Sequence, residues 1–149
     1  MSYFVERFRF LLSEKNMSTV DFKEKVGIST TQSGKYLAGY YEPSLKNIIK
    51  ICEYFKCSID YIMGLDDIPN RFGNFNVPSV SKFLDRYNDL LIKNKTNHNR
   101  ATKELKFNRN NLIYWKQNKT FPTLTILYNL ANYLSTSIEY LIGRTDIRS

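Results

Sequence analysis

Hydrophobic and polar residues alternate with a helical period from the start of the chain. Phe4, Phe8, Leu11 and Leu12 lie three, four or one position apart with charged residues between them, which is typical of a helix with one buried face. Four further short segments up to residue 63 show the same period, and each follows a serine that can cap its first turn: Ser18, Ser29, Ser44 and Ser58. This part of the chain therefore predicts five short helices.

Apolar residues on one face of each helix form the expected core. Beyond the first helix, the inward positions are Phe22, Val26, Tyr36, Leu45, Ile48, Ile49, Cys52, Phe55, Ile59, Tyr61, Ile62 and Met63. Gly27 supplies the left-handed backbone that ends the second helix. Ser33 and Gly34 weaken the third helix, since a glycine inside a helix costs roughly 1 kcal/mol relative to alanine.

The helical period stops after the fifth segment. Residues 68–79 contain two prolines, one glycine and three asparagines, so we interpret them as a linker between a first domain of residues 1–67 and a second domain of residues 80–149. The linker is not wholly polar. Ile68, Phe72, Phe75 and Val77 could pack it against one of the domains, which would make the connection semi-rigid.

The second domain repeats the first. The segment SIDYIMG at residues 58–64 returns as SIEYLIG at residues 137–143, an offset of 79 residues. The same offset, without a gap, pairs identical residues in the preceding segments: Phe4 with Phe83, Arg7 with Arg86, Leu11 with Leu90, Pro43 with Pro122 and Tyr54 with Tyr133. Identities concentrate at core positions, while the outward faces of the two third helices share almost nothing. This pattern indicates an internal duplication.

The segment Phe107–Pro122 combines core anchors with polar side chains at helical spacing. Asn108 is the expected N-cap, and Leu112 and Trp115 are the expected buried residues. Four side chains then face outward: Arg109, Asn110, Asn111 and Tyr114. Arginine can donate two hydrogen bonds to guanine in the DNA major groove, and asparagine pairs in the same way with adenine. Taken alone, an ordinary amphipathic helix with a solvated face explains the segment equally well.

The charge distribution changes this picture. The chain has 149 residues, a net charge of +8 and 42% hydrophobic residues, which is enough for one ordinary domain or two small ones. Residues 1–70 hold nine basic and nine acidic side chains, whereas residues 71–149 hold thirteen basic and five acidic ones. The entire positive excess lies in the second part, and such an asymmetry suggests a partner that is a polyanion.

Several classes of protein are disfavoured by the same sequence. No apolar run is long enough for a membrane span and no secretory signal is visible, so we expect a cytoplasmic protein. Cys52 and Cys57 have neither metal-site spacing nor the pattern of a disulfide framework, and we interpret them as reduced core residues. Asp66 and Asp67 lack partners for acid-base or metal chemistry and are interpreted as solvated helix-end residues. We therefore expect no enzyme, no metal and no cofactor.

Both halves resemble the Cro and phage-repressor type of helix-turn-helix domain, the XRE family. The likeness is carried by FKEKVGISTTQSGKYLAGYYEPSL with SIDYIMG in the first half, and by ATKELKFNRNNLIYWKQNKTFPTL with SIEYLIG in the second. It implies an all-α fold of two tandem five-helix lambda-repressor-like domains. Three positions depart from the family pattern: Lys106 replaces the turn glycine, Asn118 replaces the glycine after the third helix and tolerates a left-handed backbone, and Ser33 replaces a buried aliphatic residue.

The resemblance also implies which residues meet DNA, because in this family the third helix lies in the major groove. The implied base-facing residues are Thr30, Thr31, Gln32 and Lys35 in the first half and Arg109, Asn110, Asn111 and Tyr114 in the second. The phosphate-facing residues, from the resemblance and from their chemistry, are Thr19, Tyr40, His98, Lys116, Asn118 and Lys119. For His98, a simple solvated residue is the stronger interpretation.

The leading functional hypothesis is a sequence-specific regulator of transcription that binds double-stranded DNA, acts as a repressor and forms homodimers. Both halves would read DNA, or only the basic second half would, while the first pairs with another copy of the chain or binds a regulator. The alternative is a phage or mobile-element factor that uses the same scaffold to grip a protein or nucleoprotein partner, because fold does not settle function.

Overall fold

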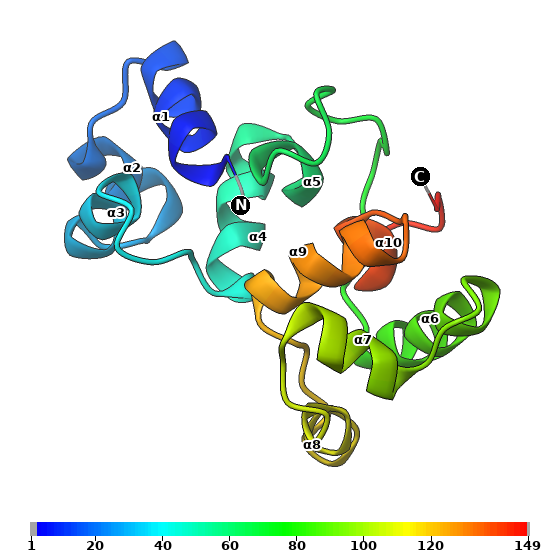
Figure 1. Cartoon of the computed structure of the whole chain (residues 1–149). Helices are drawn as coiled ribbons and strands as arrows, with labels where there is room; N and C mark the ends of the chain where they lie inside the picture. Colours follow the sequence, from blue (N-terminus) through cyan, green and yellow to red (C-terminus); the bar gives the residue numbers. More distant parts are fainter. Residues whose placement is uncertain (1–2, 149) are drawn as a thin grey trace. The chain divides into compact units, whose positions relative to one another are not determined.

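The computed structural model describes residues 3–148. Residues 1 and 2 of the first expected domain and residue 149 of the second lie outside that range. The described chain contains ten helices and no strand (Figure 1), so the expected all-α fold is confirmed. Contacts divide the chain into two compact units, Met1–Arg71 and Phe72–Ser149, which are described separately below as unit 1 and unit 2. Within residues 3–148, no helix has the length and apolar character needed to cross a bilayer.

Unit 1 consists of five helices that begin where the sequence predicts. They are α1 Phe4–Glu14, α2 Thr19–Val26, α3 Thr30–Leu37, α4 Leu45–Phe55 and α5 Ile59–Ile62. All four expected serine caps are present, since the hydroxyls of Ser18, Ser29, Ser44 and Ser58 each accept a hydrogen bond from the backbone N–H three residues later. At α2 the cap is reciprocal, because Asp21 also accepts from the backbone N–H of Ser18, and these bonds lower the pKa of the Asp21 carboxyl.

Aromatic side chains form the centre of the unit 1 core. The rings of Phe4 and Phe8 stack 5.4 Å apart, Phe8 meets Phe22 edge-on at 5.2 Å, and Phe4 meets Tyr36 edge-on at 6.0 Å. Some expected core residues are only half-buried, because they lie where helix faces turn towards solvent: Val26, Leu45, Ile49, Phe55 and Tyr61. α3 is thus held to α1 and α2 through the core.

Unit 2 also contains five helices. They are α6 Val80–Lys93, α7 His98–Leu105, α8 Asn111–Asn118, α9 Leu124–Tyr133 and α10 Ile138–Leu141. Side chains of Ser79, Asn97, Thr123 and Ser137 cap four of them. Two ring contacts of unit 1 recur, with Phe83 and Tyr87 stacked 5.7 Å apart and Trp115 edge-on to Phe83 at 5.5 Å, whereas Ala101 stands at the position of Phe22.

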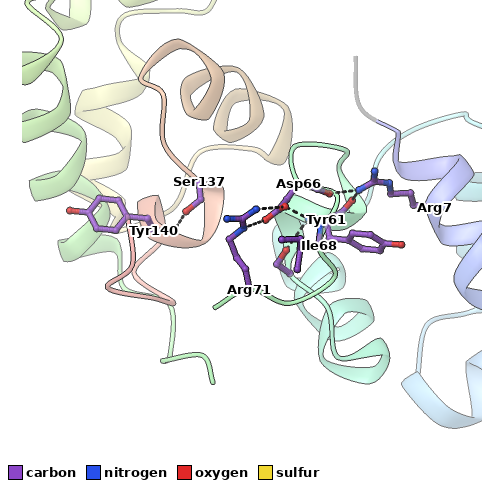
Figure 2. Close-up of polar contacts among 8 residues, drawn as sticks. Arg7, Tyr61, Asp66, Ile68, Arg71, Ser137 and Tyr140 are labelled. Carbon is purple, nitrogen blue, oxygen red and sulfur yellow. Dashed lines mark hydrogen bonds and ion pairs between the residues drawn. The ribbon is translucent and has the colours of Figure 1, made fainter. Parts of the chain in front are cut away.

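In each unit, an arginine of the first helix binds the fifth helix and the residues that follow it. In unit 1, Arg7 donates to the carbonyls of Tyr61 and Asp66 (Figure 2). It also pairs with the Asp67 carboxylate at 2.9 Å. Its guanidinium also lies over the Tyr61 ring, 4.4 Å from the centroid. Asp67 is therefore an ion-pair partner of the first helix and not only a solvated helix-end residue.

The equivalent arginine of unit 2 makes the equivalent contacts. Arg86 donates to the carbonyls of Tyr140 at 2.6 Å and Thr145 at 2.8 Å, and to the Asp146 carboxylate at 2.8 Å. Its guanidinium lies 4.0 Å from the centroid of the Tyr140 ring. Every partner of Arg86 lies 79 positions after the matching partner of Arg7.

The expected linker is divided between the two units. Residues up to 71 stay with unit 1, where Arg71 pairs with Asp66 and lowers the pKa of that carboxyl (Figure 2). Residues 72–79 pack on unit 2, with Phe72 buried and the Phe75 ring 4.3 Å from the buried Arg144 guanidinium, which also pairs with Glu139. The expectation that Ile68 and Val77 help to pack the linker is wrong, because both are exposed, Val77 by 84%.

Candidate nucleic-acid interface

In unit 1, α2 and α3 are joined by a short turn whose geometry follows from its sequence. Gly27 has φ of 83°, the left-handed conformation that glycine adopts without strain, and Ser29 caps α3 two residues later. The far end of α3 is also fixed, because Arg9 of α1 donates to the Leu37 carbonyl at 2.9 Å and Asn47 of α4 donates to the Tyr36 hydroxyl at 2.9 Å. These contacts hold α3 as a rigid element with one face towards solvent.

The solvent face of α3 carries most of the first base-facing set. Thr31, Gln32 and Lys35 are exposed, and Thr30 is half-buried. Gly34 lies among them in open space. A helix with polar side chains on a fixed outer face is available to an external partner.

Ser33 lies on the opposite face of α3, in the core. It is fully buried, and its hydroxyl has no hydrogen-bond partner within residues 3–148. The core therefore accepts this serine where the resemblance implies an aliphatic side chain, at the cost of an unsatisfied polar atom.

In unit 2, the turn between α7 and α8 differs from the expectation. Lys106 takes the left-handed conformation of the turn glycine, with φ of 59°. Asn108 does not cap a helix at residue 109, because its side chain accepts from the Asn110 N–H, 2.8 Å away, and closes a short turn. α8 begins only at Asn111, whereas α3 begins at the position equivalent to Arg109. Arg109 and Asn110 thus lie in the turn before the helix.

An aromatic cluster anchors α8 to its unit. The buried Trp115 ring lies near the rings of Phe83, Tyr87, His98 and Phe107, with centroid distances between 5.5 and 6.5 Å. The expected burial of Trp115 is confirmed. Leu112 is only half-buried, because it borders a groove that is also lined by Leu84, Leu91 and Ile92 of α6.

The second base-facing set is mostly open to solvent. Arg109, Asn110 and Tyr114 are exposed, Tyr114 by 58%, while Asn111 is half-buried. Ile113 is 55% exposed beside Tyr114 and was missed by sequence reasoning, which looked only for polar side chains. Its spacing of three from Asn110 puts it on the same outward face. In the sequence, Ile113 can be recognised as an apolar residue that does not follow the helical spacing of the buried residues Leu112 and Trp115.

His98 is not the solvated residue that we expected. One ring nitrogen, Nε2, lies 2.8 Å from the Arg109 carbonyl, and the other, Nδ1, lies 2.7 Å from the Tyr87 hydroxyl. The carbonyl can only accept, so Nε2 donates, and where the ring carries this one proton Nδ1 accepts from the Tyr87 hydroxyl. Burial, with a smaller contribution from Tyr133, raises the pKa of Tyr87 far above its usual value, so the hydroxyl keeps its proton.

The other phosphate-facing candidates differ in exposure. Tyr40 is 75% exposed, and Lys116, Asn118 and Lys119 are exposed, whereas Thr19 is half-buried at the start of α2. The left-handed residue after α8 is Lys119, with φ of 50°, and not Asn118, which is the last residue of the helix. Relative to α3 at the offset of 79, α8 ends two positions later and the left-handed residue comes one position later.

Among residues 3–148, no cluster of three or more histidine, cysteine, aspartate or glutamate side chains occurs that could hold a metal ion. Cys52 and Cys57 are both buried, as expected for core residues.

Comparisons with known proteins agree with the geometry of unit 1. Residues 9–62, which include α2, the Gly27 turn and α3, match the family described as Helix-turn-helix. Residues 9–62 form a helix-turn-helix domain. The expectation for the first half is thereby confirmed, and the match ends before unit 2, so a second helix-turn-helix stays a prediction.

One curated protein that is similar to part of the chain is the uncharacterized HTH-type transcriptional regulator YobD of Bacillus subtilis (strain 168). It is 30% identical over 67 residues, which is 45% of this chain and 60% of that protein. The chain thus spans less than two thirds of its relative's length. No solved structure matches the chain significantly.

Proposed function

We propose that this protein is a sequence-specific regulator of transcription that binds double-stranded DNA and has no catalytic activity. The observation that carries the proposal is the outer face of α3, which lies in a helix-turn-helix domain and presents Thr31, Gln32 and Lys35 to solvent on a helix fixed at both ends. A helix held in this way can enter the major groove, where such side chains reach base edges. The relative named a transcriptional regulator supports the same proposal.

We also propose that unit 2 is a second helix-turn-helix domain, so that the two occur in tandem. Two observations support this. The contacts of Arg86 repeat those of Arg7 at an offset of 79 residues, and the ring geometry around Phe83 repeats that around Phe4. α7, the Lys106 turn and α8 would then be the helix-turn-helix of this unit.

In this proposal the base-facing residues come from both units. Thr30, Thr31, Gln32 and Lys35 would read DNA in unit 1, and Arg109, Asn110, Asn111, Ile113 and Tyr114 in unit 2. The asparagines suit adenine, Arg109 suits guanine, and Ile113 suits the methyl group of thymine. The two sets differ so much that the two halves of an operator would have unlike sequences.

Contacts to phosphates would come from side chains around these helices. Thr19, Tyr40, Lys116, Asn118 and Lys119 can donate to phosphate oxygens. Both nitrogens of His98 are engaged inside unit 2, so we assign the phosphate contact at the start of α7 to Arg100, whose side chain is exposed in the first turn of that helix.

The mode of action follows from binding. A protein that occupies an operator blocks other proteins from the same DNA, so we propose repression. Each base-facing set is small, and two chains bound together would supply the affinity that one set lacks, so we propose a homodimer acting in the cytoplasm.

The test begins with selection of bound duplexes from a random pool, since the length and symmetry of the enriched motif report how many helices engage. Affinity is then measured by mobility shift on the selected duplex. We expect Arg109→Ala with Asn110→Ala to lower affinity at least tenfold and to relax the preference at the bases they read, because each good contact discriminates by about 1–3 kcal/mol. Lys93→Ala, a charge removed from the exposed end of α6, is the matched control. Unchanged affinity and preference in the double variant would contradict the reading role.

A second candidate function is binding of a protein partner through unit 1. It is favoured by two adjacent tyrosines in one loop, Tyr40 and Tyr41, which are 75% and 45% exposed. Salt dependence separates the two functions. DNA affinity falls linearly with salt on a logarithmic scale, by a slope of about 0.9 for each phosphate neutralised. A flat response would favour the protein partner.

A further inference from the structure

His98 occupies a position from which it can control the turn that carries Arg109 and Asn110. It is the first residue of α7, and its Nε2 donates to the Arg109 carbonyl at 2.8 Å. That carbonyl belongs to the turn, two residues before α8 begins at Asn111. A hydrogen bond at this point fixes the backbone from which both side chains leave.

The ring of His98 is itself held in one orientation. The hydroxyl of Tyr87, a residue only 2% exposed, lies at hydrogen-bond distance from Nδ1, 2.7 Å away, and donates to it in the tautomer whose proton is on Nε2. The rings of Tyr87, Phe107 and Trp115 lie around the imidazole at centroid distances of 5.8, 6.0 and 6.5 Å. The core of unit 2 thus selects the tautomer with a proton on Nε2, which is the form that can donate to a carbonyl.

Unit 1 lacks both members of this arrangement. At the positions 79 residues earlier, Tyr87 corresponds to Phe8, which has no hydroxyl, and His98 corresponds to Thr19. Unit 1 has instead a glycine turn and a serine cap immediately before α3. The histidine and the tyrosine therefore occur together in the unit whose turn starts with the non-glycine Lys106 and whose helix starts two residues later.

We infer that His98 is a positioning residue for sequence reading by unit 2, which sets the backbone of the turn from Asn108 to Asn110 through its bond to the Arg109 carbonyl, and not a contact to phosphate. This inference rests on the proposed DNA-binding function. Two side-chain bonds add to the backbone bonds of the turn: the Asn108 side chain accepts from the Asn110 N–H, and His98 ties the turn to α7. Loss of the bond to His98 would release the turn from α7 and change the direction of Arg109 and Asn110, although both side chains remain.

Three substitutions separate the roles of the two ring nitrogens. His98→Gln keeps an N–H near the position of Nε2, His98→Asn keeps a polar group near Nδ1 only, and His98→Ala keeps neither. All three remove a ring from the aromatic cluster to the same extent, so a purely structural role predicts similar losses in all of them. Thermal unfolding of each variant reports that structural cost.

Binding to the selected operator and to a random duplex is measured over a range of salt concentrations. We expect His98→Asn and His98→Ala to lose about tenfold in discrimination at the bases read by unit 2, and His98→Gln to retain most of it, with an unchanged salt slope in all three. A slope that falls by about 0.9, with equal losses on every duplex, would identify a phosphate contact and overturn the inference. Equal discrimination in all variants, or equal loss in all three, would also overturn it.

A readout without DNA separates this inference from the proposed function. In the free protein, the ¹⁵N shifts of the His98 ring should report a protonated Nε2 and an unprotonated Nδ1 that accepts a hydrogen bond. The amide shifts of Asn110 and Asn111 should change in His98→Asn and much less in His98→Gln. If the wild-type chain enriches no duplex, DNA reading fails, and these shifts still decide whether His98 fixes the turn. The opposite tautomer would refute it.

Discussion

At the scale of single residues, the clearest energetic imbalance is the hydroxyl of Ser33. It is fully buried on the inner face of α3 and has no hydrogen-bond partner within the described chain. Burial of an unsatisfied polar group costs about 1–3 kcal/mol. The side chain offers no compensating contact, so its hydroxyl lowers the stability of unit 1.

We therefore expect Ser33→Ala to raise the free energy of unfolding of unit 1 by about 1 kcal/mol. Urea denaturation followed by circular dichroism measures the change. Ser29→Ala is the matched control on the same helix, since it removes the cap on the Gln32 N–H and should lower stability by about 1 kcal/mol. Destabilisation by Ser33→Ala would mean that the hydroxyl has a partner, such as a buried water.

Ile113 provides a residue-scale test of base reading. It is 55% exposed on the outer face of α8, next to Tyr114. If it covers a thymine methyl, deoxyuridine at that position should weaken binding about fourfold, because a buried methylene group contributes about 0.8 kcal/mol. The same replacement should leave the affinity of Ile113→Ala unchanged. Ile92→Ala, which removes a 68% exposed isoleucine from α6, should respond to deoxyuridine as the wild type does.

At the scale of elements, the turns before the third helices of the two units begin with the same left-handed backbone conformation but with different residues. Both need a left-handed backbone after the second helix, with φ of 83° at Gly27 and 59° at Lys106. A residue with a Cβ atom pays roughly 1 kcal/mol for this conformation, whereas glycine adopts it freely.

We expect Lys106→Gly to raise the stability of unit 2 by about 1 kcal/mol, and Gly27→Ala to lower that of unit 1 by a similar amount. Thermal or urea unfolding of the two variants measures both effects. Lys103→Gly, at an exposed position inside α7, is the control and should lower stability by about 1 kcal/mol. Equal destabilisation by both lysine variants would contradict the assignment of strain to Lys106.

Those elements that depend on interactions between residues close together in the sequence could be predicted from it. The serine caps of α2 to α5 and the glycine turn were predictable, because each depends on atoms within about three residues. The start of α8 was not, and the turn before it is in contact with α7 and α6 through the bonds that join Arg109, His98 and Tyr87, which lie eleven positions apart in the sequence. Sequence spacing carries no direct record of such tertiary bonds. The same reason explains why Phe75 was identified as a packing residue without its partner Arg144.

At the scale of the whole molecule, the two units differ in charge but share the arginine contacts that stabilise them. Unit 2 holds twelve basic and five acidic side chains against ten and nine in unit 1, so unit 2 would supply most of the attraction to a polyanion. The arginine contacts that stabilise the fold are nevertheless the same in both units. Arg7 and Arg86 each donate to one backbone carbonyl in the fifth helix of their own unit and to one carbonyl and one aspartate just after it.

This division predicts where each arginine contributes its stability. Arg7→Gln should lower the hydrogen-exchange protection of α1 to α5 by about 2–3 kcal/mol, because it leaves two half-buried carbonyls without a charged donor. Arg86→Gln should do the same for α6 to α10. The ion pairs to Asp67 and Asp146 contribute little, since these carboxylates are 97% and 74% exposed, so Asp67→Asn and Asp146→Asn should change protection by less than about 1 kcal/mol. If the aspartate variants lose as much protection as the arginine variants, the ion pairs, and not the hydrogen bonds to the carbonyls, would be the stabilising contacts of the two arginines. The likeness of the two units would then depend on their surface ion pairs.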